Sequence, residues 1–152
     1  MKSVVFCSSQ RFKNEMETFI ERLRSCAKAR GSHIMVLEPN FEDHPESFLN
    51  QHEKDRLLNN MYKNTVAGKV YDHLFRKVRV ADVCFIFNKD GYIGVNTAGE
   101  LFAAAALGKT IYALHKKTLM GHYPNGLYEE PSPGKLVHEI VESPEELLER
   151  LL

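Results

Sequence analysis

Short apolar runs alternate with stretches of helical period along the chain. The runs carry no three-to-four-residue period, so they predict β-strands rather than helices. One of them, residues 82–87, is apolar almost throughout and rich in β-forming residues, which is typical of a central strand covered on both faces. The five predicted strands lie at residues 3–7, 33–37, 82–87, 110–114 and 136–141.

Between the strands, apolar positions recur every three or four residues and predict helices. The first is expected to begin at Asn14, which offers an N-cap with Glu17 three residues later, and to end near Arg30. Residues 40–63 give a mixed signal, and residues 115–134 show no clear period. Further helices are expected at residues 65–79, at residues 98–107 and after Ser143.

This alternation predicts a single α/β domain over residues 1–152, with three layers and a mostly parallel five-stranded sheet. We expect the flavodoxin-like strand order 2-1-3-4-5, in which a ligand sits beyond the carboxyl ends of the first and third strands. That geometry selects the residues that follow these two strands. They are Cys7, Ser8, Ser9, Gln10 and Arg11 at the end of the first strand, and Asn88, Lys89 and Asp90 after the third.

Charge balance and cysteine content narrow the class of protein. Lys and Arg (20) equal Asp and Glu (20), and the zero net charge argues against a nucleic-acid polymer or an anionic membrane as partner. The longest apolar run, residues 101–107, is too short to cross a membrane, and three cysteines without a CxxC pair fit reduced thiols. We therefore expect a cytoplasmic protein. Cys26 and Cys84 are interpreted as packing residues, and no base that would activate Cys7 is visible.

The remaining polar and aromatic residues have ordinary interpretations. Seven histidines form neither an HExxH motif nor a Cys/His cluster, so the sequence predicts no metal and no cofactor. His73 is expected to be a semi-buried surface residue. Tyr123 and Tyr128 are suited to stacking on a planar base, to a subunit contact or to simple surface anchoring.

The segment 88–100 joins the central strand to a helix N-terminus. Gly91 and Gly94 allow the backbone to come close to a ligand, and the N–H groups of the first helical turn favour an anion such as a phosphate. Glycines in such a loop also serve simply to make the turn, and both interpretations stay open. The candidate substrate-binding residues here are Asn88, Gly91, Tyr92, Gly94, Asn96 and Thr97.

Glu100 also has two interpretations. Thr97-x-x-Glu100 has the spacing of a capping box, in which Glu100 would bond back to the backbone N–H of Thr97. A carboxylate in the first helical turn, facing the anomeric carbon of a sugar, can instead act as a nucleophile. Both interpretations place Glu100 at the same point of the crevice.

A longer pattern runs from the central strand to the next one. It consists of Ala81-Asp82-Val83, then Thr97-x-x-Glu100-Leu101, a small-residue helix, and Gly108-Lys109-x-Ile111. This pattern resembles the nucleoside 2-deoxyribosyltransferase superfamily. The resemblance implies cleavage or transfer at an N-glycosidic bond, with Glu100 at the position of the glutamate that forms a glycosyl-enzyme ester. The implied partner is a small-molecule nucleoside or nucleotide.

Other roles follow from the resemblance or depart from it. Asp90 is the nearest candidate acid for the leaving base, with Asn88 as a neutral donor, and Ser8 and Ser9 match serines that hold a 5′-phosphate in a nearby nucleotide-hydrolase branch. Asn96 stands where the family usually has Gly, and Thr110 where it has Pro.

Two classes of function remain: a hydrolase or transferase, or a non-catalytic nucleotide-binding sensor in which Glu100 only caps its helix. A flavodoxin-like electron carrier is a weaker third, because the first loop lacks a phosphate-binding run beyond Ser8-Ser9. The helix at residues 101–107 is apolar nearly all round, so its outer face needs cover from another element or a second copy. We expect a homodimer or higher homo-oligomer.

Overall fold

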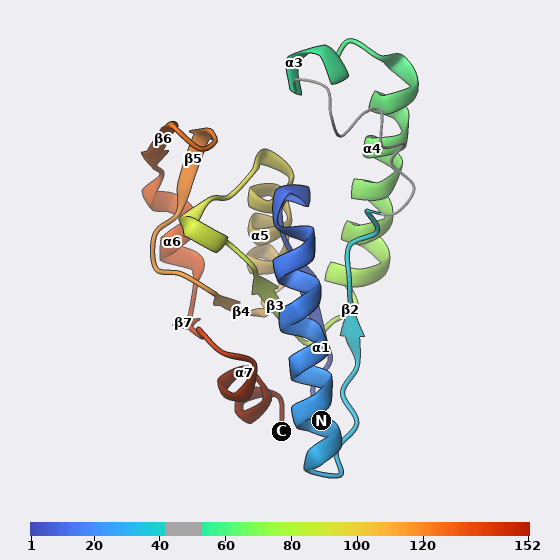
Figure 1. The fold of residues 1–152 in the computed structure, drawn as a ribbon, viewed down its shortest axis with the longest axis vertical. Coiled ribbons are helices and arrows are strands. Elements are labelled where there is room, and N and C mark those ends of the chain that lie inside the picture. The colour runs from blue at the N-terminus through green and yellow to red at the C-terminus, as the bar shows by residue number, and fades with distance from the viewer. Residues whose placement is uncertain (42–52) are drawn as a thin grey trace.

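The computed structural model describes residues 1–41 and 53–152 and has a five-stranded sheet at its centre (Figure 1). The strands are β1 (Val4–Cys7), β2 (Val36–Leu37), β3 (Val83–Ile86), β4 (Thr110–Ala113) and β7 (Glu139–Ile140). They lie in the order β2-β1-β3-β4-β7, and every neighbouring pair is parallel. The predicted order 2-1-3-4-5 is confirmed, with β7 as the fifth strand.

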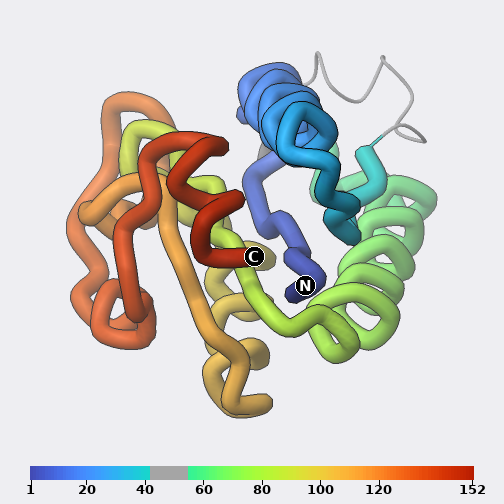
Figure 2. The backbone as a smooth tube through the Cα atoms, turned by 90° about the horizontal axis from the view of Figure 1, so that it is seen from below, coloured from blue at the N-terminus to red at the C-terminus, as the bar shows by residue number. Residues whose placement is uncertain are grey.

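Helices cover both faces of the sheet and complete the three layers (Figure 2). They are α1 (Lys13–Ala29), α3 (Glu53–Arg56), α4 (Asn60–His73), α5 (Val95–Ala106), α6 (Pro131–Leu136) and α7 (Pro144–Leu151). Successive strand residues point to opposite faces, so each strand feeds two cores. In β1, Val4 and Phe6 pack with α1 and α7, whereas Val5 and Cys7 pack with α5.

The start of α1 differs from the sequence prediction. A short 3₁₀ turn, η1 (Gln10–Phe12), comes first, and the hydroxyl of Ser9 caps it by accepting the N–H of Arg11 at 3.4 Å. The helix then begins at Lys13 without a side-chain cap. The prediction of Asn14 as N-cap is therefore wrong, because the chain is already helical before that residue.

Helix α4 begins earlier than predicted and ends in an unusual turn. Asn59 caps it by accepting the N–H of Tyr62 at 3.0 Å, so the helix starts at Asn60 rather than at residue 65. Directly after His73 the backbone widens into a π-helical turn, η2 (Leu74–Val78). The part of the mixed segment at residues 42–52 lies outside the described residues.

The segment 115–134, which shows no period in the sequence, contains a hairpin. Its strands are β5 (Leu119–His122) and β6 (Gly126–Glu129), paired antiparallel. The hairpin lies beside the loop after β3, where a 3₁₀ turn, η3 (Lys89–Gly91), is followed by a bridge between Tyr92 and Leu119. At the end of the chain, the predicted cap of α7 is confirmed as a complete capping box between Ser143 and Glu146.

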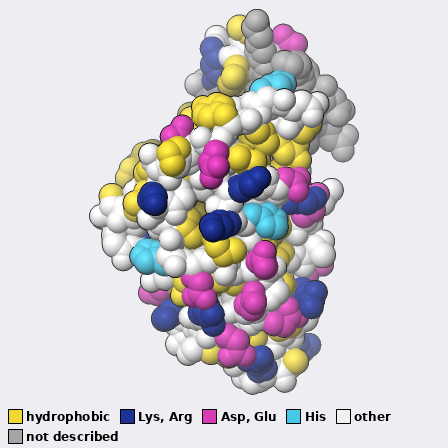
Figure 3. Space-filling view, turned by 90° about the vertical axis from the view of Figure 1, so that its left-hand side faces the viewer, with side chains coloured by type: hydrophobic (Ala, Val, Ile, Leu, Met, Phe, Trp, Pro, Cys, Tyr) yellow, Lys and Arg dark blue, Asp and Glu magenta, His cyan; other side chains and the backbone are white. Residues whose placement is uncertain are grey.

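The surface and the chain ends agree with the balanced composition. On the face shown in Figure 3, acidic and basic side chains are interspersed, and no large patch of one sign appears there. The two termini lie side by side (Figure 2), and the N–H of Lys2 donates to the carbonyl of Leu151 at 3.0 Å. None of the described helices combines the length and apolar character needed to cross a bilayer.

Candidate functional site

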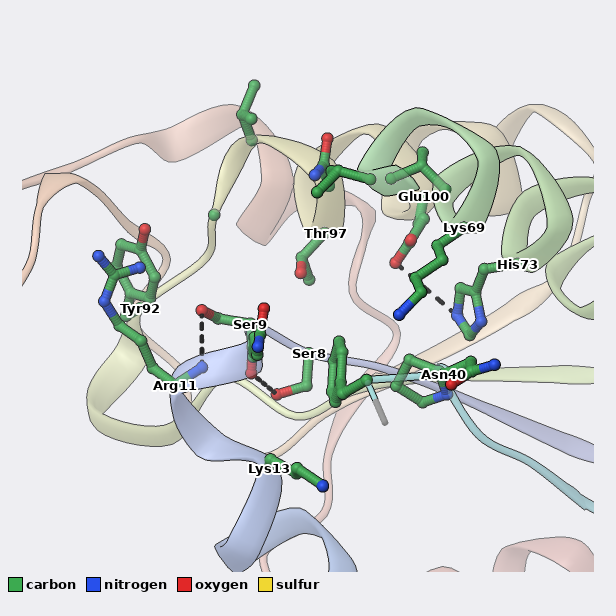
Figure 4. Close-up of a pocket in the computed structure, with 18 of the residues that line it drawn as sticks. Ser8, Ser9, Arg11, Lys13, Asn40, Lys69, His73, Tyr92, Thr97 and Glu100 are labelled. Atoms are coloured by element: carbon green, nitrogen blue, oxygen red, sulfur yellow. Dashed lines mark hydrogen bonds and ion pairs between the residues drawn. The ribbon is translucent and has the colours of Figure 1, made fainter. Parts of the chain in front are cut away.

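A cavity of about 710 Å³ opens beyond the carboxyl ends of β1 and β3 (Figure 4). Its walls come from the loop after β1, the start of α1, helix α4 and the start of α5. This is the position that the strand order predicts for a ligand. The predicted site residues that line it are Ser8, Ser9, Gln10, Tyr92, Gly94, Asn96, Thr97 and Glu100.

Three predicted site residues do not reach the cavity wall. Asn88 is fully buried; its Nδ2 donates to the carbonyls of His115 and Lys117 at 2.9 Å, and its Oδ1 accepts the N–H of His115 at 3.0 Å. Asn88 thus ties the end of β3 to the loop after β4. Gly91 has φ +81° and lies against Lys117, where a Cβ would come within 3.0 Å of that side chain. Asp90, at φ 56°, accepts the hydroxyl of Tyr123 at 3.1 Å, so it approaches the site only through that tyrosine.

The start of α5 decides between the two interpretations of Glu100. The N-cap is Gly94, with φ −74° and ψ 167°, and no side chain caps this helix. Thr97 is therefore inside the first turn, and Glu100 lies a turn further on. Hence Thr97 and Glu100 do not form the capping box, and capping does not account for Glu100. The first-turn N–H groups of Val95, Asn96 and Thr97 have no acceptor within the helix, and all three residues line the cavity.

Glu100 is buried in a cluster of polar side chains. Only 7% of the residue is exposed, and burial raises its pKa to about 7, against a smaller opposing effect of a hydrogen bond from Cys7. His73 Nε2 lies 3.9 Å from Glu100 Oε2 and 3.5 Å from Cys7 Sγ. The second thiol, Cys84 Sγ, lies 3.7 Å from Cys7 Sγ.

The protonation states in this cluster follow from desolvation. Burial, helped by the charge of Lys77, lowers the pKa of His73 to about 4, and burial also raises the pKa of the Cys7 thiol well above its usual value. At neutral pH the imidazole and the thiol are therefore uncharged, while Glu100 is partly ionised. The His73–Glu100 contact is then not an ion pair.

Several cavity residues were missed by sequence reasoning. His73 was expected near the surface, but it is only 4% exposed and faces Glu100 across the cavity floor. It lies 27 positions before Glu100, on another helix, and no local motif joins the two. Three basic side chains were also missed, because such charges look like the solvated faces of helices. They are Lys13, Arg56 and Lys69, and they line the cavity together with Arg11, which was expected there because it follows the first strand.

These basic side chains make the wall of the cavity positively charged. Among the described residues that line it, Glu100 is the only carboxylate, against four basic side chains. The Arg11 guanidinium lies 5.5 Å from the centre of the Tyr92 ring and 5.7 Å from that of Tyr123. The site therefore combines a positive field, which attracts anions, with aromatic rings suited to a planar group.

No protein-family model and no curated protein sequence matches the chain. Solved structures do match it. A conserved protein from Enterococcus faecalis V583 gives a TM-score of 0.55 at 18% identity, over 99% of this chain and 97% of that one. The chain therefore shares the fold of that protein. This match agrees with the three-layer α/β architecture predicted from the sequence.

Two further matches are to proteins with named activities. A 2-deoxyribosyltransferase from Bacillus psychrosaccharolyticus gives a TM-score of 0.49 at 19% identity, over 96% of this chain and 90% of that one. A CMP N-glycosidase from Clostridium botulinum gives 0.40 at 18%, over 97% of each chain. At this distance the chemistry of the present chain has to be argued from its own site.

The buried carboxyl makes a prediction about stability. Because the folded-state pKa of Glu100 is about 7 against an ordinary value of 4.5, the native protein keeps this proton where the unfolded chain has lost it. The stability that the protonated Glu100 carboxyl contributes is fully present below pH 4.5 and is lost as the pH rises through 7. Glu100→Gln should therefore gain stability relative to the parent protein between pH 5 and 8, by about 3 kcal/mol.

Urea unfolding at a series of pH values measures this difference. His73→Gln is the matched variant, and its stability should change with pH in the opposite direction. The pKa of His73 is lowered from 6.5 in the unfolded chain to about 4 in the folded protein. The neutral imidazole therefore contributes stability that is present above pH 6.5 and is lost as the pH falls through 4. Relative to the parent, His73→Gln should lose stability between pH 4 and 7. If the free energy of unfolding of Glu100→Gln differs from that of the parent by the same amount at every pH, the burial of this carboxyl is contradicted.

Proposed function

We propose that the chain cleaves or transfers at the N-glycosidic bond of a nucleoside or nucleoside 5′-monophosphate, with Glu100 as the nucleophile. The observation that carries this proposal is the position of Glu100. It is the single carboxylate among the described residues of the cavity wall, it is mostly buried, and it does not cap its helix.

In the proposed reaction, a Glu100 carboxylate oxygen attacks C1′ of the bound sugar. The new C–O bond forms as the C1′–N bond breaks, and the base leaves with that electron pair and takes up a proton. Water or a second base then attacks C1′ and releases the Glu100 carboxylate. A negative charge held in a poorly solvated site stabilises the positive charge that develops on the sugar in both steps.

The distribution of charge favours a phosphorylated substrate. Ser8 and Ser9 line the cavity together with Arg11 and Lys13 (Figure 4). The Ser8 hydroxyl donates to the carbonyls of Ser9 and Phe87 at 3.1 and 3.2 Å, so it would have to turn away from them to reach a phosphate. Phosphate oxygens accept strong hydrogen bonds from such groups. We therefore propose that the 5′-phosphate lies at this end. Tyr123, whose hydroxyl donates to Asp90, lies at this same end, with its ring 5.7 Å from the Arg11 guanidinium.

A non-catalytic nucleotide sensor is the second candidate. It is favoured by one observation: with a pKa of about 7, much of Glu100 is protonated at neutral pH, which weakens a nucleophile but not a binding site. Thermal stabilisation by nucleotides without any release of base would support the sensor.

The first functional prediction concerns Glu100. Glu100→Gln keeps the shape of the side chain and removes the nucleophilic oxygen, so base release from 5′-monophosphates should fall by about a thousandfold or more. Chromatography of the released base measures it. Asp90→Asn is the matched acid-to-amide variant; since Asp90 lies off the cavity wall and Asn tolerates its positive φ, the loss there should stay below about tenfold. Full activity in Glu100→Gln would remove Glu100 from the mechanism.

A second prediction concerns the phosphate. Lys13→Gln removes a cation at the proposed phosphate end, so kcat/KM for a 5′-monophosphate should fall by roughly tenfold. The value for the unphosphorylated nucleoside should hardly change. Lys28→Gln, near the far end of the same helix, is the matched control and should alter neither value. Equal losses for nucleoside and nucleotide would place the phosphate elsewhere.

A homodimer is also proposed. Helix α6 packs against α5 and covers part of its outer face, but Phe102 and Leu107 are still about half exposed. A second copy of the chain would cover this remainder. Light scattering at micromolar concentration should give the mass of a dimer, and the mass of a monomer would contradict this.

A further inference from the structure

Three side chains that are far apart in the sequence meet beneath the cavity and have not all been given a role. They are Cys7 at the end of β1, His73 at the end of α4 and Glu100 in α5. Their Sγ, imidazole nitrogen and carboxylate oxygen all lie within 4.8 Å of one another. A thiolate, an imidazole and a carboxylate are the three side-chain ligands that Zn²⁺ takes in proteins.

The distances suit one ion. With bonds of about 2.0 to 2.3 Å, the ligands of a tetrahedral zinc ion lie roughly 3.3 to 3.8 Å apart. Cys7 Sγ and His73 Nε2 are already 3.5 Å apart, and His73 Nε2 and Glu100 Oε2 are 3.9 Å apart. The third pair, Cys7 Sγ and a Glu100 carboxylate oxygen, lies within 4.8 Å. Side-chain shifts of up to about 1 Å would bring all three pairs to the range of a tetrahedral ion.

The histidine is held in a way that suits a ligand. His73 is 4% exposed and its Nε2 points into the cluster. The backbone carbonyl of Phe6 interacts with the His73 ring. Among the described residues, however, none makes a hydrogen bond of good geometry with the other ring nitrogen, Nδ1. Metal-bound histidines commonly turn the second nitrogen toward such a carbonyl. The π-helical turn η2 begins at the next residue, and such turns often occur at functional sites.

The charges also fit. The three residues are only 0%, 4% and 7% exposed, so an ion bound among their side chains would be largely shielded from water. A divalent cation would balance one thiolate and one carboxylate, leaving the group neutral. His73 and Glu100 line the 710 Å³ cavity, so a fourth position on the ion would face that space.

We propose that Cys7, His73 and Glu100 form a binding site for one divalent zinc ion, with the fourth position open to the cavity. Binding converts the Cys7 thiol to a thiolate and releases its proton to solvent, as it does any proton on Glu100. The site does not depend on the proposed glycosyl chemistry. It does compete with it, because a carboxylate that binds an ion is no longer a nucleophile.

The test uses the whole chain and measures metal binding without any substrate. After treatment with a chelator, equilibrium dialysis against Zn²⁺ should give one ion per chain. Co²⁺ in place of Zn²⁺ should give the near-ultraviolet charge-transfer band of a thiolate ligand. In Cys7→Ser the band should vanish, and in His73→Gln and Glu100→Gln the Kd for Zn²⁺ should rise by about tenfold or more.

Cys26→Ser is the matched control. Cys26 is a half-buried thiol on α1, where its Sγ lies 3.5 Å from a carboxylate oxygen of Glu145, and its removal should change neither stoichiometry nor spectrum. A parent protein without the thiolate band, or a band that survives in Cys7→Ser and disappears in Cys26→Ser, would overturn the site. Circular dichroism checks that each variant folds; if Cys7→Ser does not, the parent spectrum and the Kd of Glu100→Gln decide.

Discussion

The desolvation of one carboxyl group controls the chemistry of this site. Glu100 projects from the second turn of α5 toward the end of β1 and the end of α4, and these elements leave it 7% exposed. Water would otherwise stabilise its charge, so burial alone raises its pKa to about 7. The same packing keeps His73 and Cys7 neutral. A single proton on Glu100 therefore decides whether the cluster of Cys7, His73 and Glu100 is charged.

The rest of the cavity wall complements that group. The sheet places the loop after β1 and the loop after β3 side by side, because the two strands are neighbours and parallel. The first loop supplies hydroxyls and Arg11, while the second leads through Gly94 into the open first turn of α5. Basic and N–H groups thus surround the space above Glu100. Such an arrangement holds an anionic ligand in place while leaving a carboxylate beneath it.

Much of the fold could be predicted because it depends on local patterns. The apolar strings at residues 3–7 and 82–87 and the box at Ser143 act over a few residues, and the structure bears them out. The start of α5 could not be read this way. Thr97 and Glu100 have the spacing of a capping box, but Gly94 adopts an extended conformation that begins the helix a turn earlier.

The candidate site could be predicted only in part, for a related reason. The residues that follow β1 and those around the start of α5 were found, because strand order alone locates them. His73 was not, since its role comes from the packing of α4 over the end of β1. Asn88 was expected to face a ligand, yet its amide is taken up by the backbone of His115 and Lys117. Tertiary contacts of this kind leave no signal in a local motif.

The most direct test of the central claim is to look for the covalent intermediate. Protein mixed with a 2-fluoro-substituted nucleoside 5′-monophosphate, which slows release of the sugar, should gain the mass of one sugar phosphate. After digestion, mass spectrometry should locate it on the peptide that contains Glu100. A sugar found on another residue, or base released with no covalent adduct at any time, would contradict the account.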